Sequence, residues 1–269
     1  MKTVKFLFSL YFEICKKNFQ NNMVYRSNTF MGILNTFIVV VVNISVWKAL
    51  YGNNQTVNGV NFMATVTNLI LGIGISSAFY IDEFFVANKI RTGDISSDLL
   101  KPINFQLYVL SVNLGNIIYR LLIQFLPTLI LSVLIFGLLP PSSFLNLIFF
   151  IISLVMGFLV LYYLSFCLSL ISFWYFNIWS FVTFKNALIT VFSGVYLPYW
   201  FMPGWVNKIV DFTPFKTIYA TPINVYLGNV SLSQIPYYYG QQMIWIILLW
   251  AVSRLLWKIG DKRLTIQGG

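Results

Sequence analysis

The residues that could do chemistry in this chain are concentrated in one short polar stretch between two long apolar segments. Residues 82–104, hereafter the polar segment, read DEFFVANKIRTGDISSDLLKPIN and hold four of the seven acidic residues of the sequence. These four are Asp82, Glu83, Asp94 and Asp98. On a helix, the adjacent carboxylates of Asp82 and Glu83 would point about 100° apart, so they would not share an acid–base site. We interpret them as solvated boundary residues and expect the polar segment to contact a soluble partner.

The rest of the sequence lacks the residue patterns of the common enzyme classes. There is no histidine, which removes the most frequent general base and a frequent metal ligand. Cys15 and Cys167 lie too far apart for a metal-binding or disulfide pattern, and we expect two free thiols. No phosphate loop, zinc-protease motif or G-x-S-x-G motif occurs. We therefore expect no catalytic residues, no metal site and no cofactor bound by this chain.

Composition predicts a membrane protein. Hydrophobic residues make up 58% of the chain and charged residues 9%, whereas soluble domains carry about 25% charged residues. Six segments are apolar enough to be expected as membrane-spanning helices. They are, approximately, residues 30–50, 62–80, 117–139, 144–171, 187–199 with flanks, and 242–256 with flanks. The predicted fold class is an all-α polytopic membrane protein, with residues 1–269 as a single transmembrane domain.

The positions of the basic residues predict the orientation of these spans. Most Lys and Arg residues fall in segments on one side, and only Lys48, Lys208 and Lys216 fall on the other. Because cytoplasmic loops carry the excess of basic residues, we place both termini and the polar segment in the cytoplasm. This topology accounts for the net charge of +10, so no nucleic-acid partner is inferred.

The beginning of the N-terminal residues 1–28 is somewhat similar to a signal peptide, but its apolar run is too short and broken, and no small-residue cleavage site follows. Residues 1–28 are expected to form an amphipathic helix on the inner membrane surface. Lys5, Lys16 and Lys17 would face the lipid headgroups.

Arg120 and Pro127 are the candidate functional residues inside a span. A span starting at Phe105 would place Arg120 about 22 Å along the helix, a depth that usually marks function. A span starting at Ile117 would instead let Arg120 reach the inner interface by snorkelling, and we favour this interpretation. Pro127 is expected to bend the helix, because its ring removes a backbone hydrogen bond.

Residues 197–236 are dense in Pro, Gly and aromatic residues, and their apolar runs are too short to span. Irregular backbone at membrane depth is tolerated only where protein or a water-filled cavity covers it. We expect one or two short helices that dip into the outer leaflet, and the alternative is an external loop with aromatic anchors. The residues expected to shape this outer gate are Gly194, Pro198, Pro203, Gly204, Pro214 and Pro222.

The polar segment itself predicts a short, well-defined helix. Gly93 permits a sharp turn, Asp94 is a plausible N-cap for the sequence ISSDLLK, and Pro102 would end the helix. Leu99 and Leu100 would offer an apolar surface. Polar contacts at its rim are expected from three charged residues, Arg91, Asp98 and Lys101. The alternative is a solvated loop that serves only as a topology signal.

Three stretches resemble a known family, the permease subunits of type-2 (ABC-2) ATP-binding cassette exporters. They are KIRTGDISSDLLKPINFQ at Lys89–Gln106, the Pro- and Gly-rich stretch at Ser193–Asn229, and QGG at Gln267–Gly269. The resemblance covers nearly the full length and is closest to the branch of bacterial viologen-exporter-like permeases.

This resemblance implies an efflux permease in a bacterial plasma membrane. Residues Arg91, Gly93, Asp94 and Asp98–Pro102 would form a coupling helix that docks into a separate ATPase subunit. Two permease chains, identical or homologous, would pair with two ATPase copies, and ATP and Mg²⁺ would bind on the ATPase. The alternatives are an ion-coupled secondary transporter, for which we find no central intramembrane carboxylate, and a non-transporting scaffold.

Overall fold

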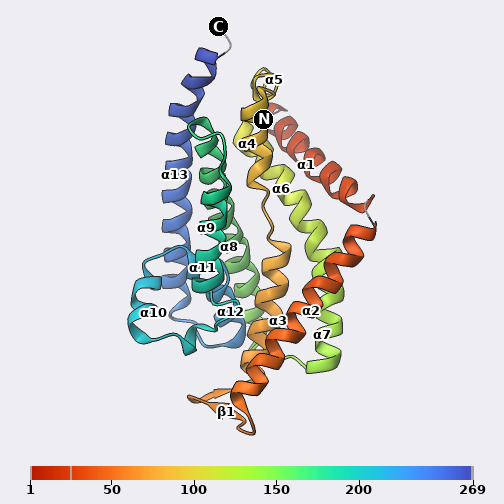
Figure 1. Ribbon diagram of the computed structural model, residues 1–269, viewed down its shortest axis with the longest axis vertical. Coiled ribbons are helices and arrows are strands. Elements are labelled where there is room, and N and C mark those ends of the chain that lie inside the picture. The colour runs from red at the N-terminus through yellow and green to blue at the C-terminus, as the bar shows by residue number, and fades with distance from the viewer. Residues whose placement is uncertain (1, 25, 268–269) are drawn as a thin grey trace.

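The computed structural model describes residues 2–24 and 26–267, and almost all of its regular structure is helical (Figure 1). In chain order the elements are α1 (Lys2–Met23), α2 (Arg26–Tyr51), β1 (Thr56–Val57), β2 (Val60–Asn61), α3 (Phe62–Ala78), α4 (Glu83–Thr92), α5 (Ile95–Leu99), α6 (Phe105–Tyr119), the π-helical η1 (Arg120–Phe125), α7 (Leu126–Phe136), α8 (Phe144–Leu170), the 3₁₀ turn η2 (Ile171–Phe173), α9 (Trp179–Phe192), the 3₁₀ turn η3 (Tyr199–Phe201), α10 (Gly204–Asp211), α11 (Phe215–Ile218), α12 (Ala220–Leu227) and α13 (Ile235–Gln267).

Within the described residues, five helical stretches are long and apolar enough to cross a membrane. They are Ser27–Tyr51, Phe62–Thr92, Phe105–Phe136, Phe144–Phe173 and Ile235–Arg263. An all-α polytopic membrane protein is therefore confirmed, with five such stretches where the sequence predicted six segments.

The segment predicted at residues 187–199 is the one that does not appear as a long helix. Its place is taken by α9, which begins at Trp179, ends at Phe192 and has 14 residues. These residues correspond to a helix of about 21 Å, shorter than the roughly 30 Å hydrocarbon core that a span must cross. The break comes at Gly194, whose φ of +78° is readily adopted only by glycine. A β-carbon there would also lie 2.9 Å from the Ala220 side chain.

The two ends of the molecule differ in what they carry. Figure 1 shows α4, α5, the start of α1 and the C-terminal end of α13 at one end, with the β1–β2 hairpin and α10 at the opposite end. In the hairpin, Asn58 and Gly59 both have positive φ, as expected for a two-residue turn of type I′. The segments predicted to be cytoplasmic thus share one end.

The helix predicted at residues 117–139 begins twelve residues earlier, at Phe105, and runs through α6, η1 and α7 without a break. Its 32 residues correspond to about 48 Å, more than the roughly 30 Å of a bilayer core. The π-helical η1 directly precedes α7, whose second residue is Pro127. Such a stretch accommodates a carbonyl group that the proline ring leaves without its usual partner.

The N-terminal helix α1 does more than lie at a surface, because it packs along α6. The Tyr11 hydroxyl accepts the Asn104 N–H at 2.9 Å. Gly115 makes this approach possible, since a β-carbon there would lie 2.3 Å from the Cys15 carbonyl oxygen. Lys16 and Lys17 are exposed, as predicted, while the Lys5 side chain lies outside the described residues.

The core is centred on α3. In the candidate span that contains α3, 67% of the most apolar 18-residue stretch is buried inside the protein. The corresponding share is 17–39% in the other four candidate spans. Gly74 of α3 lies against the Phe125 ring, which leaves no room for a β-carbon. α3 therefore packs directly on η1, and its C-terminal end leads into the polar segment.

Candidate functional site

The polar segment folds into two short helices that meet at a sharp turn. Asp82 caps α4 by accepting the Phe84 N–H at 3.0 Å. Gly93 ends α4 with φ +80°, as the sequence predicted. Asp94 is the N-cap residue of α5, as predicted, but its side chain makes no capping bond, because its carboxylate accepts the Thr92 hydroxyl at 2.7 Å.

Asp98 joins the two helices of the polar segment. Its buried carboxylate accepts hydrogen bonds from Lys89 at 2.5 Å and from Lys101 at 2.6 Å. Burial would raise the pKa of Asp98, but the hydrogen bonds and charges of the two lysines outweigh it, and the pKa lies below its usual value. The predicted rim role of Asp98 is therefore wrong, since its carboxylate fixes α5 to α4 from inside.

The tip of the polar segment presents leucine side chains to the outside. Leu100 is 88% exposed and Leu99 is 38% exposed. Helix α5 ends at Leu99, three residues before Pro102, close to where the sequence placed its end. The tip is thus a small apolar surface on a base that ion pairs hold in place.

A buried ion pair lies behind the polar segment. Glu83, the first residue of α4, is 4% exposed, and Lys185 of α9 is 8% exposed. Their side chains form an ion pair, and the Lys185 ammonium also donates to the Ser165 hydroxyl of α8 at 3.2 Å. The interpretation of Glu83 as a solvated residue is therefore wrong, whereas Asp82 is exposed as expected. The pair ties the start of the polar segment to α8 and α9.

Arg120 contacts the C-terminal end of α3. Its guanidinium donates to the Ser77 carbonyl at 3.4 Å and lies 4.7 Å from the centre of the Tyr80 ring. These contacts hold the side chain against the protein, over the residues that lead into the polar segment.

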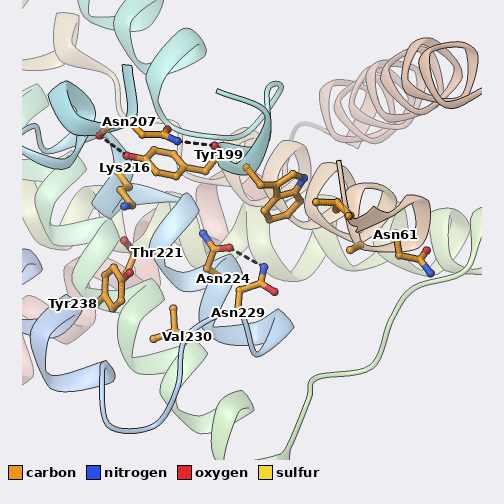
Figure 2. Close-up of a pocket in the computed structure, with 13 residues that line it drawn as sticks. Asn61, Tyr199, Asn207, Lys216, Thr221, Asn224, Asn229, Val230 and Tyr238 are labelled. Atoms are coloured by element: carbon orange, nitrogen blue, oxygen red, sulfur yellow. Dashed lines mark hydrogen bonds between the residues drawn. The ribbon is translucent and has the colours of Figure 1, made fainter. Parts of the chain in front are cut away.

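At the opposite end of the molecule, an open cavity of about 480 Å³ lies between the region of α10–α12, the β1–β2 hairpin and the start of α3 (Figure 2). In Figure 2, the side chains of Tyr199, Lys216 and Tyr238 lie on one side of it. Lys216 forms an ion pair with Asp211, and its ammonium lies 4.0 Å from the centre of the Tyr199 ring. Within residues 2–24 and 26–267, Lys216 is the one charged residue that lines this cavity, and its ion pair with Asp211 balances its charge.

The predicted outer-gate residues form bends and helix ends in this region and do not line the cavity. Gly194 accepts a hydrogen bond on its carbonyl from Asn68 of α3 at 3.0 Å. Four prolines and one glycine lie at or near the starts of short helices: Pro198 before η3, Pro203 and Gly204 at the start of α10, Pro214 before α11, and Pro222 in the first turn of α12.

Comparison with known protein families gives a match over most of the chain. A family model described as ABC-2 family transporter protein matches residues 37–268. The chain belongs to the ABC-2 transporter family. No curated protein matches the sequence.

In this ABC-2 family member, sequence reasoning missed Glu83, Lys185 and Lys89 as structural partners. The available signal was Lys185 itself, a lone cation in the apolar stretch that became α9. A charge in such a position is costly unless it has a partner. The carboxylate that pairs with it lies 102 residues earlier, so spacing in the sequence gave no indication of which acid it would be.

Proposed function

We propose that the chain is the membrane-spanning permease subunit of an ATP-driven exporter and that its polar segment docks on a separate ATPase subunit. The observation that carries this proposal is the exposed Leu99–Leu100 tip on a base held by Asp98, Lys89 and Lys101. An apolar side chain that is 88% exposed, outside the apolar helices, is suited to burial in a partner's groove. ATP and Mg²⁺ bind on that partner.

Movement of the polar segment reaches the membrane helices through two contacts. Glu83 connects α4 with α9 and α8 through Lys185. Arg120 connects the end of α3 with the long third helix. A push on the tip therefore acts on several helices together, which is the mechanical role expected of a coupling helix.

The proposed topology has six crossings with both termini in the cytoplasm. α9 and the residues that follow it supply the sixth, because α8 and α13 both run between the two ends of the molecule and α9 lies beside them (Figure 1). Five crossings would leave the start of α1 and the end of α13 on opposite sides. The helices α10–α12 form the outer re-entrant region, and α1 is the interfacial helix.

An exposed polar face of α9 supports the proposal of a second permease chain. Thr183, Asn186 and Thr190 follow each other at helical spacing and are all exposed. Polar side chains on a membrane helix usually face a protein partner or a water-filled path. A symmetric pair of chains would cover this face, and the pair would carry two ATPase subunits. Cargo would leave past the outer cavity.

The docking proposal is tested by co-purification from the native host, with mass spectrometry to detect an ABC ATPase subunit that associates with the tagged chain. Leu99→Asp with Leu100→Asp should abolish the association while membrane insertion stays unchanged. Ser96→Asp with Ser97→Asp is the matched control, because it adds the same charge to exposed positions of α5 and keeps both leucines. Association that survives the leucine changes, or that is lost equally in the control, would refute the docking assignment.

The Glu83–Lys185 pair favours a second candidate function, an ion-coupled carrier. It places the Glu83 carboxylate, which the sequence suggested to be solvated, as a buried group inside the helical stretch Phe62–Thr92, and such groups occur in ion relays. The two functions separate on the energy source: transport by a carrier stops when an ionophore dissipates the ion gradient. Transport by the proposed exporter stops when the ATPase subunit is inactivated.

A further inference from the structure

The end of the molecule that carries the polar segment contains a separate cavity with two arginines. Its volume is about 330 Å³, and it lies between α4, the turn after α8 and the last part of α13. Arg91 comes from α4 and Arg263 from α13, while Phe173, Trp174 and Phe176 come from the turn. These three parts of the chain lie at the same end of the molecule in Figure 1.

Both guanidinium groups are held over aromatic rings. Arg91 lies 5.4 Å from the centre of the Phe176 ring, and Arg263 lies 5.6 Å from the centre of the Trp174 ring. Across residues 2–24 and 26–267, the structure gives neither group an ion-pair partner. Among the described residues, none that lines the cavity is acidic. Two cations therefore converge on one space without a counter-charge.

Close packing fixes the walls of this cavity. Gly260 lies so near Phe173 that a β-carbon would be 2.3 Å from its ring, and the Trp257 ring lies 6.0 Å from the same ring. The turn η2 contacts both α4 and α13. Arg91 and Arg263 are thus brought together by the packing of the helices.

An exposed apolar stripe leads up to the arginines. Leu255 and Ile259 precede Arg263 by two turns and one turn of α13, so the three share one face, and both apolar side chains are exposed. On the turn, Phe176 is 79% exposed. Aromatic residues are favoured at the headgroup level of a bilayer. The surface is therefore apolar along the membrane helix and cationic at its cytoplasmic end.

We propose that this cavity binds the phosphate headgroup of an anionic phospholipid of the inner leaflet. Arginine forks bind phosphate oxygens in a bidentate manner, and basic pockets between membrane helices on the cytoplasmic side suit anionic lipids. The acyl chains lie along Leu255 and Ile259. A free phosphate ion, or a carboxylate of a soluble partner, would bind to the arginines but would make no contact with the apolar stripe. The assignment requires that α13 spans the membrane with its C-terminal end in the cytoplasm, and it is independent of the proposed transport function.

The test measures lipid binding to the purified full-length chain without any ATPase. Native mass spectrometry counts the phosphatidylglycerol or phosphatidylcholine molecules retained from equimolar mixed micelles, and inorganic phosphate is the third probe. The chain should retain phosphatidylglycerol selectively, and inorganic phosphate at millimolar concentration should not displace it. Arg91→Gln with Arg263→Gln should weaken this binding about 30-fold, from the attraction of two basic side chains to an anionic lipid.

Arg254→Gln with Lys258→Gln is the matched control, since it removes two positive charges from exposed positions of α13 that do not line the cavity. Equal loss in this control would show diffuse attraction and overturn the site, as would equal retention of both lipids. Displacement of the lipid by inorganic phosphate would assign the cavity to free anions instead. If the glutamine variant does not fold, Arg91→Lys with Arg263→Lys tests the proposal instead. This variant keeps both positive charges but loses the guanidinium groups that bind phosphate through two parallel hydrogen bonds. Full retention by the lysine variant would overturn the proposal.

Discussion

Removing one partner of the Glu83–Lys185 pair should destabilise the protein strongly, because the charge left behind would be buried. Both residues are more than nine-tenths buried, and in Lys185→Met the Glu83 carboxylate loses its one described hydrogen-bond donor. Breaking a buried pair from one side costs about 3–5 kcal/mol. For a chain of this length, 1 kcal/mol corresponds to about 2–4 °C in Tm. The melting temperature of Lys185→Met should therefore fall by roughly 6–20 °C.

The double variant Glu83→Leu with Lys185→Met separates the pair from the charge that is left alone. Replacing both members of a buried pair by apolar residues of similar volume is often neutral or stabilising. The double variant should thus melt well above Lys185→Met and near the unsubstituted protein. Asp82→Asn is the neighbouring control: it removes an exposed charge and keeps a side chain that can cap α4, so its cost should stay below about 0.5 kcal/mol.

The assay is thermal unfolding of the full-length chain in detergent, followed by tryptophan fluorescence. If Lys185→Met lowers the free energy of unfolding by about 1 kcal/mol or less, the pair behaves like a solvent-exposed one. The buried arrangement of α4, α8 and α9 would then be refuted. A double variant that is as unstable as the single one would contradict the attribution to an unpaired charge.

Three further predictions address separate parts of the fold. The pKa of Asp98 is lowered in the folded protein, so its stabilisation of the polar segment should persist above about pH 4 and be lost as the pH falls through its folded pKa. Amide hydrogen exchange in α5 measures this stabilisation. Equal protection of α5 at about pH 3 and about pH 6 would contradict the prediction. Gly194→Ala should cost at least about 1–2 kcal/mol in thermal stability, because of its positive φ and the contact with Ala220, and an unchanged Tm would argue against that turn. Gly115→Val should separate α1 from α6 and speed maleimide labelling of Cys15, and an unchanged rate would show that the two helices do not touch there.

The elements that follow from local pattern were predictable from the sequence. The apolar runs gave five helices that can span a membrane, and the Asn58–Gly59 turn is specified by residues that tolerate positive φ. Gly93 marked the turn inside the polar segment correctly. In each case the deciding interaction lies within a few residues of the pattern that predicts it.

Errors arose where a distant partner decides the outcome. Asp98 was expected at a rim, but Lys89 reaches it across the Gly93 turn and holds it inside. α9 ends at Phe192 because Gly194 turns the chain against Ala220 of α12, a contact that no local window contains.

Under the proposed function, the same contacts would let the polar segment act as a lever, which a solvated loop could not do. A loop joined to the membrane helices only through its backbone would respond to a push by changing its own backbone dihedral angles, and the helices would stay in place. Asp98 removes that freedom within the segment, and Glu83 removes it at the junction with α8 and α9. Both acids are buried and both are held by lysines from other turns or helices, so displacing the tip without the spans would separate buried charges. In the proposed exporter, that cost would make movement of the spans the easier response to a push on the tip.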